Sequence, residues 1–507
     1  MLVKSENKIS AGPILEFYRE LDKYNVENHS LIILYKGEVA FEHYIKPYSA
    51  EMPHTMFSLT KSVVSTAVGF AIDEGLFSLD DKVIDIFPEY EACESDEWDN
   101  ITVRSLLTMQ SNKEFSFTQD MRGNYVEMFM KAPFRQNGRG FLYSNNDAHV
   151  VAAIVQKKSG MNLVNYLTPR LFEPLGIDKP FWEFNCVGEL VGGTGCYMKL
   201  RDLAKIGQCY LNDGKWNGEQ VIPEWWTKEA TKMHVRFGNK STEGYGYLFW
   251  IHKGGYSMTG MYGQQVTCFP EKDLVMASFN CCLNDGDFSR SFENILPRAF
   301  EEEPDSKVEE QLRIYLESKN VKAVPCEKLP KIPVDKTFRL SKLSDIIAGL
   351  VFPANVIPRS VICSMAMRPG KNLNNLSFAL SEDVLTIKWK EDDDEVVIDC
   401  GLDGKPRETK VIIKGYPYIL WSYAFMKDGR LNVVVKPLNT LSTTNIVFDF
   451  YKNKVKIKID GTPDFVEFIS KNANKSDFVN NHPKMRPYIM KVVNKALLFM
   501  QRPMTFR

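Results

Sequence analysis

The chain has 507 residues, which is too long for one ordinary domain, so we expect two or three packed units, each with its own core. Its 63 Lys and Arg nearly cancel its 64 Asp and Glu, leaving a net charge of −1 without a long block of like charge. This balance argues against binding to nucleic acid or another polyanion.

The N-terminal residues 1–17 lack the apolar run and the small-residue cleavage site of a secretory signal. The sequence also lacks an apolar run of the roughly 18 residues that a membrane-spanning helix needs. We therefore expect a soluble, cytoplasmic protein with no membrane partner. The ten cysteines form no Cys-x-x-Cys pair and are expected to be small buried hydrophobic residues. The seven histidines show no metal-ligand spacing, so we expect neither a metal nor a cofactor.

The first part of the sequence alternates helical and strand patterns. A helix is predicted over residues 12–24, and two strands over 30–37 and 38–46 are joined by a short Lys-Gly turn into a hairpin. The apolar segment 54–76 predicts a second helix. Thr102 is an expected N-cap of the next helix, which begins with TVRSLLTM.

Helical patterns continue to about residue 230, after which the pattern changes to alternation. Residues 244–280 alternate apolar residues with glycine turns and predict three strands, and a helix over 289–300 closes this part. These patterns define a first domain over residues 1–300. The segment 301–335 is charged and contains several prolines, which indicates a helix and a linker between domains.

Residues 336–507 form the second predicted domain. Between residues 373 and 460, runs of alternating apolar and polar residues are separated by turn residues, which predicts an antiparallel meander or a small barrel. A terminal helix is predicted over residues 485–500.

The aromatic residues of this second domain allow two interpretations. Trp389, Trp421 and Tyr423 lie in its strands, where they could line a lipocalin-like cavity or fill a core. We favour a core, because buried aromatic side chains need no ligand to explain them. The domain could also cover the mouth of an active site and limit the size of the substrate.

Ser58 and Lys61 stand at the start of the apolar segment and offer a nucleophile and a base. On a helix, residues three apart face the same side, so the Lys61 amine can reach the Ser58 hydroxyl. A serine is a poor nucleophile unless a base accepts its proton, and burial can lower the pKa of a lysine enough for that role. A capping serine and a snorkelling lysine are the alternative. Ser5 and Lys8 have the same spacing, but they lie in a polar stretch with no apolar helix behind them.

Tyr143 and Asn145 form a Tyr-x-Asn step in a glycine-bounded loop before a predicted helix. A phenol near a lysine can relay protons to a leaving group, and the amide can bind both the lysine and a substrate carbonyl. Two further Tyr-x-Asn steps, at Tyr210 and Tyr451, fall at a helix end and in a C-terminal hairpin, where structural roles suit them.

Thr259 and Gly260 lie on a predicted strand in the stretch YSMTGMYGQ. An edge strand at this place could pair with an extended amide substrate. The backbone N–H groups of Met261 and Ser58 could then both face a developing oxyanion. A Thr-Gly pair alone is almost uninformative. This pair counts as evidence for the site because it follows the other two motifs in a matching order and spacing.

Three motifs together resemble those of the penicillin-recognising serine hydrolases: Ser58-Leu-Thr-Lys61, Tyr143-Ser-Asn145 and Met258-Thr-Gly260. The sequence looks most similar to the class C β-lactamase group, including its esterase, D-Ala-D-Ala peptidase and 6-aminohexanoate-oligomer hydrolase relatives. Connecting stretches such as ITVRSLLTMQS and GGTGCYMKLRDLAKIGQCYLNDGKW are similar to the corresponding sequences of that group. The resemblance covers about residues 30–300.

The resemblance implies an α/β fold with a β-lactamase/transpeptidase-like domain, in which helices flank an antiparallel sheet beside a helical subdomain. The mostly antiparallel β domain would follow it. Ser58 would be the acylated nucleophile, Lys61 its base partner and Tyr143 a proton relay. The expected substrate contacts are Asn145, Met258, Thr259, Gly260 and Met261.

One departure from the family pattern concerns Met258, where the third motif usually opens with Lys or His. That positive charge helps to hold a substrate carboxylate, and a thioether cannot pair with an anion. We therefore predict weak or no activity on penicillins and D-Ala-D-Ala peptides, and a preference for neutral esters or linear amides. His252 lies six residues earlier and could replace the missing charge, although we favour an exposed histidine at a strand end.

The predicted function is a serine hydrolase that forms an acyl-enzyme with a small ester or amide. The alternative is a catalytically silent relative that binds a peptide or a cell-wall fragment. The presence of Ser58, Lys61 and Tyr143 together argues against this alternative.

Overall fold

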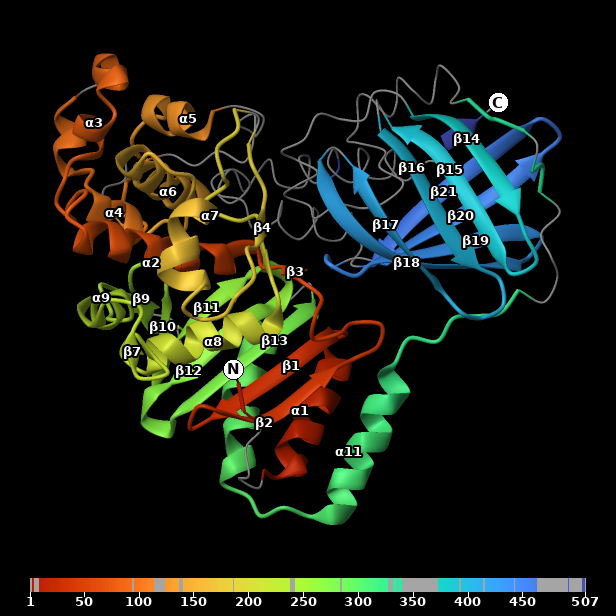
Figure 1. Cartoon of the computed structure of the whole chain (residues 1–507), viewed down its shortest axis with the longest axis horizontal. Coiled ribbons are helices and arrows are strands. Elements are labelled where there is room, and N and C mark those ends of the chain that lie inside the picture. The colour runs from red at the N-terminus through yellow and green to blue at the C-terminus, as the bar shows by residue number, and fades with distance from the viewer. Residues whose placement is uncertain are drawn as a thin grey trace. The chain divides into compact units, whose positions relative to one another are not determined.

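The computed structural model divides the chain into two units, Met1–Asn320 and Val321–Arg507, which are described separately (Figure 1). The residues that the structure describes are 2–3, 9–93, 95–113, 124–135, 140–185, 187–237, 242–282, 285–326, 332–334, 336–339, 373–391, 394–413, 415–441, 443–462, 491 and 504–506.

An antiparallel sheet runs through the first unit. Its eight described strands hydrogen-bond in the order β2-β1-β13-β12-β11-β10-β9-β8, so the N-terminal hairpin lies beside the last strand of the unit. In sheet order the strands are β2 (Glu38–Tyr44), β1 (Glu27–Tyr35), β13 (Leu274–Cys281), β12 (Gln264–Phe269), β11 (Gly255–Gly260), β10 (Trp250–His252), β9 (Gly244–Tyr245) and β8 (Val235–Arg236).

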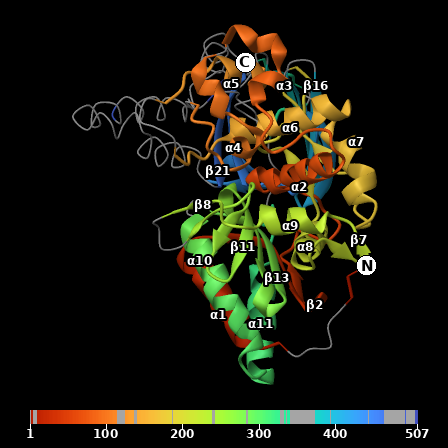
Figure 2. The ribbon, with the colours of Figure 1, turned by 90° about the vertical axis from the view of Figure 1, so that its left-hand side faces the viewer.

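Helices cover both faces of this sheet. Figure 2 shows α1 (Ala11–Lys23), α10 (Asp285–Ile295) and α11 (Ser306–Lys319) together on one side of the strands. On the opposite side, α2 (Thr60–Asp73) and α8 (Leu200–Leu211) enter the larger core of the unit.

Strand β1 shows how the two cores are separated. Leu31 and Ile33 belong to the core that contains α1 and α10, whereas Ile32 and Leu34 belong to the core that contains α2 and α8. Successive side chains of a strand point to opposite faces of a sheet, so a strand buried on both faces is apolar throughout.

A group of helices forms the upper part of the first unit in Figure 1. Short strands of the first unit form two small separate sheets, β3-β5-β4 and β6-β7. The helices of this part are α3 (Val83–Ile86), α4 (Val103–Leu107), α5 (Tyr125–Lys131), α6 (Asn145–Ser159) and α7 (Leu163–Leu167), and α9 (Glu224–Ala230) follows α8. The short strands are β3 (His54–Thr55), β4 (Phe181–Trp182), β5 (Cys196–Met198), β6 (Lys215–Trp216) and β7 (Glu219–Gln220).

The predicted elements of the first unit are largely confirmed, with two differences. Thr102 caps α4 through a capping box with Ser105. The predicted helix over 54–76 is instead a strand, a short 3₁₀ turn (Phe57–Leu59, η1) and then α2. The region 244–280 contains β9 and β10 in addition to the three longer strands, because its glycines allow tight turns between very short segments.

The helix predicted in the segment 301–335 is α11, and it belongs to the first unit. Leu312 and Leu316 are buried in the core that contains α1, and the Tyr315 hydroxyl donates a hydrogen bond to the Tyr18 carbonyl at 3.2 Å. The stretch that follows, up to Cys326, contains no regular element.

The second unit is a mostly antiparallel sheet, as predicted. Its described strands pair in the order β14-β15-β16-β18-β19-β20-β21-β22, with β17 on β18. They are β14 (Leu373–Leu380), β15 (Val384–Glu391), β16 (Asp394–Gly401), β17 (Arg407–Ile413), β18 (Tyr416–Lys427), β19 (Arg430–Pro437), β20 (Thr443–Tyr451), β21 (Lys454–Thr462) and β22 (Met504–Phe506). The predicted helix over 485–500 lies, except for Lys491, outside the described residues.

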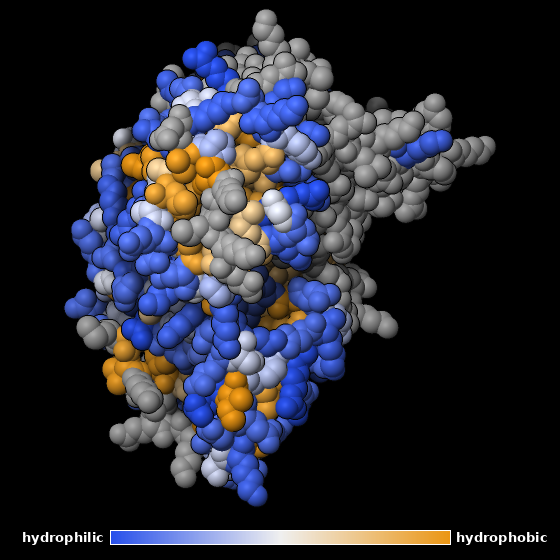
Figure 3. Space-filling model, turned by 90° about the vertical axis from the view of Figure 1, so that its right-hand side faces the viewer, coloured by the Kyte–Doolittle hydropathy of each residue, from blue (hydrophilic) through white to orange (hydrophobic). Residues whose placement is uncertain are grey.

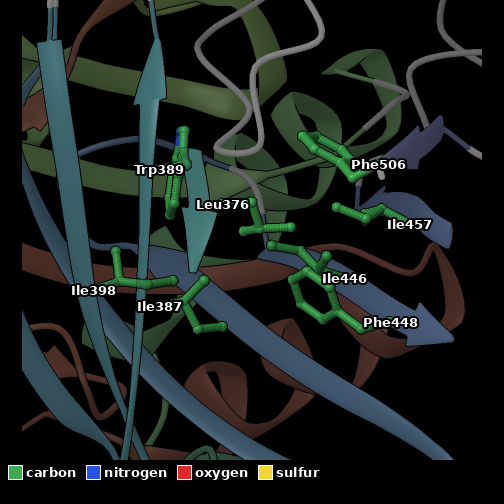
Figure 4. A pocket seen from close by; sticks show the side chains of 8 residues that line it. All are labelled: Leu376, Ile387, Trp389, Ile398, Ile446, Phe448, Ile457 and Phe506. Carbon is green, nitrogen blue, oxygen red and sulfur yellow. The ribbon is translucent and has the colours of Figure 1, made fainter. Parts of the chain in front are cut away.

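The interior of this second sheet is a packed core. Figure 4 shows side chains from β14, β15, β16, β20, β21 and β22 that converge on a gap of about 10 Å³, which is the size of one water molecule. Trp389 and Tyr423 are buried, whereas Trp421 is partly exposed. The preference for a core over a ligand cavity is therefore confirmed for Trp389 and Tyr423.

The surface in Figure 3 is mostly hydrophilic, with its apolar residues in separate groups. Within the described residues, we find no helix that is both long and apolar enough to cross a membrane. Among the described cysteines, Cys196, Cys209, Cys268, Cys281, Cys282 and Cys400 are buried, as predicted, whereas Cys326 is partly exposed.

Candidate active site

Ser58 lies in the 3₁₀ turn that leads from β3 into α2. The backbone before it is fixed, because the Met56 N–H donates a hydrogen bond to the Cys196 carbonyl at 3.0 Å. Phe57 has a φ of 49°, a left-handed conformation that is uncommon for a large side chain and that tends to occur at functional sites. The chain therefore turns sharply at Ser58, and the residues after it run into the core as α2.

Lys61 is buried, and its amine has three oxygen neighbours. The Nζ atom lies 2.9 Å from Ser58 Oγ and donates hydrogen bonds to Asn145 Oδ1 at 2.6 Å and to the Gly193 carbonyl at 2.7 Å. Burial holds the pKa of Lys61 well below its usual range. A neutral amine has two N–H groups and one lone pair. If the two N–H groups bond Asn145 and Gly193, the lone pair faces the Ser58 hydroxyl.

Tyr143 reaches the same place from the segment before α6. Ser144 caps α6 by accepting a hydrogen bond from the Asp147 N–H at 3.1 Å, so Tyr143 stays in the extended chain just outside the helix. Its ring lies against Trp250, with centroids 5.3 Å apart, and the Lys61 nitrogen is 4.8 Å from the ring centroid.

The phenol of Tyr143 is protonated at neutral pH. Burial raises its pKa above the usual range, and a hydrogen bond with the Ser58 hydroxyl acts in the opposite direction. At rest the phenol is thus a hydrogen-bond donor, and Lys61 is the better base of the two.

The third predicted motif lies on β11, but not at an edge of the sheet. β11 pairs with β12 along its length and with β10 from Gly255 to Ser257. The expectation that this strand lies at an edge of the sheet was therefore wrong. Only its last part, from Met258 to Gly260, has no described partner strand on the β10 side. The short length of β10 causes this difference, and it leaves the backbone from Met258 to Gly260, next to the nucleophile, without a partner on that side among the described strands.

The side chains of this motif point to two faces. Met258 belongs to the large core and is only 1% exposed, whereas Thr259, Gly260 and Met261 line a pocket with Ser58. Because neighbouring residues of a strand alternate, Met258 cannot face this pocket when Thr259 does.

Gly260 is required by a close approach of two backbone segments. A Cβ atom at this position would clash with the carbonyl oxygen of Met56, two residues before the nucleophile. Beyond it, Tyr262 has a φ of 67°, and its ring lies 5.4 Å from that of Phe57. The strained residue before Ser58 and the strained residue after Met261 therefore contact each other.

The pocket has a volume of about 370 Å³ and reaches from Ser58 along β11. The described residues that line it include no Lys or Arg. Its lining is Ser58, Tyr143, Thr242, Trp250, His252, Ser257, Thr259, Gly260, Met261, Gly263, Gln264, Gln265, Ser289 and Glu293.

His252 does lie at a strand end, but the expectation that it is exposed was wrong. It is 6% exposed, since it packs against Phe269, and burial lowers its pKa. A neutral imidazole cannot replace the positive charge that is missing at Met258.

Several residues around the site had no signal that we recognised in the sequence. Gly193 accepts a hydrogen bond from Lys61, and its Gly-Gly pair in VGGTGC was a usable hint of a close backbone approach. Asp147 is buried, accepts a hydrogen bond from Ser111 at 2.9 Å, and has its pKa raised to about 7 by burial. Glu293, on α10, lines the pocket from a helix whose sequence gave no reason to connect it with Ser58.

Within the described part of the chain, no three His, Cys, Asp or Glu side chains gather in an arrangement that could hold a metal ion. The groups next to Ser58 are a lysine, a phenol, an amide and backbone atoms. This set can move protons and stabilise an oxyanion.

Comparison with known proteins decides the family. Residues 16–280, which are more than half of the chain, match the family model described as Beta-lactamase. The chain belongs to the beta-lactamase family. It is thus a member of a family of serine hydrolases, and Ser58, Lys61, Tyr143 and Thr259 all fall within the matched residues.

A 6-aminohexanoate-dimer hydrolase of Paenarthrobacter ureafaciens is 24% identical over 286 residues, which are 50% of this chain and 72% of that protein. Among solved structures, a putative 6-aminohexanoate-dimer hydrolase from Bacillus anthracis has a TM-score of 0.48 and 17% identity, covering 62% of this chain and 87% of that one. An octameric penicillin-binding protein homologue from Pyrococcus abyssi has a TM-score of 0.44 and 15% identity, covering 88% of this chain and 97% of that one.

Proposed function

We propose that this beta-lactamase family member is a serine hydrolase that forms an acyl-enzyme at Ser58 with linear amides or neutral esters. The observation that carries the proposal is the environment of Lys61. Its buried nitrogen lies 2.9 Å from Ser58 Oγ, and its pKa is lowered by burial. These are the two properties that a lysine needs to act as a base toward a serine.

In the proposed first step, Ser58 Oγ attacks the carbonyl carbon of the substrate and its proton moves to Lys61 Nζ. The carbonyl oxygen becomes an oxyanion, which the N–H groups of Ser58 and Met261 stabilise. Tyr143 donates its proton to the leaving group and regains one from Lys61. Water then attacks the carbonyl carbon of the acyl-enzyme, and its proton passes through the same groups to Ser58 Oγ as the ester bond breaks and the acid product leaves.

The proposed substrate class follows from the charge of the pocket. Penicillins and D-Ala-D-Ala peptides carry a carboxylate near the scissile bond, and the described pocket residues offer no Lys or Arg to pair with it. The backbone of β11 at Thr259, which has no described partner strand on the β10 side, can instead hydrogen-bond an extended amide. The relative from Paenarthrobacter ureafaciens is named a 6-aminohexanoate-dimer hydrolase, and this dimer is a linear amide, which supports the proposed preference for linear amides.

A fluorophosphonate probe tests the enzyme assignment. We expect wild-type protein to be labelled and Ser58→Ala to remain unlabelled, whereas the exposed-serine variant Ser318→Ala should label like the wild type. If folded wild-type protein does not react, the chain is a silent binder of the family and the proposal is wrong.

Kinetics on two substrates test the proposed specificity. We expect kcat/KM for p-nitrophenyl acetate to exceed that for a penicillin, because only the penicillin brings an unpaired carboxylate into the pocket. A clear preference for the penicillin would contradict the proposal.

A further inference from the structure

His149 is a buried residue of α6 that lies one helical turn after Asn145, so the two side chains share a face of this helix. Asn145 Oδ1 accepts a hydrogen bond from Lys61 Nζ at 2.6 Å. His149 Nδ1 accepts a hydrogen bond from the backbone N–H of Gly192 at 3.2 Å. The next residue, Gly193, offers its carbonyl to the Lys61 amine at 2.7 Å. The same face of α6 thus contacts Lys61 directly and also holds the backbone that supplies its second acceptor.

The Gly192–Gly193 segment packs tightly against this face of α6. A Cβ at Gly192 would lie 2.7 Å from the Ala148 carbonyl oxygen, and a Cβ at Gly193 would lie 2.9 Å from the Asn145 carbonyl oxygen. Any side chain at these two positions would therefore force a shift of the backbone. Glycine itself has few steric preferences, so hydrogen bonds decide how the peptide groups of this segment are turned.

The hydrogen bonds of His149 show which ring nitrogen carries the proton. A backbone N–H only donates, so Nδ1 presents its lone pair to Gly192. The proton of the neutral imidazole then lies on Nε2, which is 3.3 Å from Glu189 Oε2. The hydrogen bond with His149 lowers the pKa of Glu189, so this side chain is a carboxylate that accepts the Nε2–H at neutral pH.

The backbone that leads to Gly192 is held on both sides of one peptide group. Asn185 fixes Glu189, because its Nδ2 donates to Glu189 Oε2 at 2.9 Å and its Oδ1 accepts from the Glu189 N–H at 2.9 Å. The Val191 carbonyl accepts a hydrogen bond from Trp182 Nε1 at 3.0 Å. The N–H of the same peptide group belongs to Gly192, and its described partner is the imidazole on α6.

We propose that His149 orients the Lys61 amine by holding Gly192, the residue before the carbonyl that this amine bonds. It is a positioning residue, and the inference rests on the proposed hydrolase function. If the Gly192 N–H loses its acceptor, the peptide groups after it can turn, and the Gly193 carbonyl moves off the amine. The amine then keeps Asn145 as its only fixed acceptor and can rotate, so its lone pair no longer faces the Ser58 hydroxyl.

Two amide side chains separate the two contacts of the imidazole. The oxygen of asparagine lies two bonds from Cβ, as Nδ1 does, whereas the terminal atoms of glutamine lie three bonds from Cβ, as Nε2 does. His149→Asn therefore keeps an acceptor for the Gly192 N–H and loses the contact with Glu189. His149→Gln keeps a group that reaches Glu189 and loses the acceptor. Both variants replace the ring with a buried amide, so each is the matched control of the other.

Hydrolysis of p-nitrophenyl acetate and labelling by a fluorophosphonate probe compare these variants, at a temperature at which circular dichroism shows them folded. We expect His149→Asn to keep kcat/KM and the labelling rate within about threefold of wild type, and His149→Gln to lose about tenfold or more in both. A histidine that only fills the core would give equal losses, and one that acts through Glu189 would favour glutamine. Either result would overturn the proposal.

Amide hydrogen exchange at Gly192, followed by mass spectrometry, is a readout that needs neither turnover nor labelling. We expect this amide to exchange slowly in wild type and His149→Asn, and about tenfold faster or more in His149→Gln. Rapid exchange in the wild type alone, or equal rates in the three proteins, would overturn the proposal. If the rates differ as expected but the wild type neither hydrolyses the ester nor reacts with the probe, the hydrolase function fails, whereas the anchoring of Gly192 by His149 stands.

Discussion

The nitrogen of Lys61 has three oxygen neighbours, and only the Ser58 hydroxyl can give it a proton. The Asn145 side-chain oxygen and the Gly193 carbonyl only accept hydrogen bonds. They therefore orient the amine, and burial removes the water that would otherwise keep it charged.

The pH dependence of ester hydrolysis should report this lowered pKa. Only neutral Lys61 can accept a proton, so kcat/KM for p-nitrophenyl acetate should rise with pH and level off well below the usual lysine pKa of about 10.4. The raised pKa of Tyr143 keeps the phenol protonated across this plateau.

A comparison with Lys61→Arg shows whether the lysine is the group that titrates. Guanidinium does not lose its proton in this range, so this variant should lose about 10²–10⁴-fold in rate. A wild-type profile that still climbs steeply at pH 10, or an active arginine variant, would contradict the assignment of the base.

Gly260 offers a test of geometry without a change in the reacting groups. Gly260→Ala places a Cβ against the Met56 carbonyl, which must move β11 away from the turn that carries Ser58. We expect a fall in kcat of about 10²-fold, since small displacements of reacting groups cost that much. Gly140→Ala is the matched control, because open space surrounds a Cβ there. Equal activity of the two variants would show that hydrolysis does not need the close approach of β11 to the turn that carries Ser58.

At the scale of elements, the strongest sequence patterns predicted the fold well. The apolar runs of β1 and α2 and the cap at Thr102 depend on local periodicity, which a single sequence displays. The order of the three motifs likewise located Ser58, Lys61 and Tyr143, which the structure brings together.

The features of the site that the sequence did not reveal depend on contacts between segments that are distant in the chain. Thr259 has no described partner on the β10 side because β10 begins only at Trp250, which pairs with Ser257. The burial of His252 depends on Phe269 of another strand. Glu293 reaches the pocket only because α10 packs on the face of β11 that also carries Ser257. None of these contacts has a local pattern.

The packing of α2 on α9 predicts a stability effect. A Cβ at Gly69 would clash with the ring of Trp226, which is fully buried. Gly69→Ala should therefore destabilise the protein by about 1–3 kcal/mol despite the better helix propensity of alanine. Urea denaturation measures this difference, with Gly140→Ala again as the control. A variant as stable as the wild type would show that the two helices can separate at little cost.

At the scale of the whole molecule, the described residues near Ser58 all belong to the first unit, and the described buried residues of its cores extend no further than Leu316. We propose that the hydrolase domain ends after α11 and that residues 1–320 fold alone. The sequence indicated an end near residue 300 because charge and proline mark the segment that follows.

Two truncations test where this domain ends. A fragment of residues 1–320 should unfold cooperatively and hydrolyse p-nitrophenyl acetate. A fragment of residues 1–300 loses Leu312 and Leu316 from the core with α1, and should be less stable by about 3 kcal/mol or more. Equal stability of the two fragments in urea would place α11 outside the domain.

Trapping of the acyl-enzyme tests whether Ser58 is acylated during turnover. Wild-type protein is quenched with acid during turnover of p-nitrophenyl acetate, and its peptides are mapped by mass spectrometry. We predict that the added mass of the acyl group is found on the peptide that contains Ser58, and that the Ser58→Ala protein carries none. Turnover without an adduct on this peptide, or an adduct that persists at the same level in Ser58→Ala, would contradict the account.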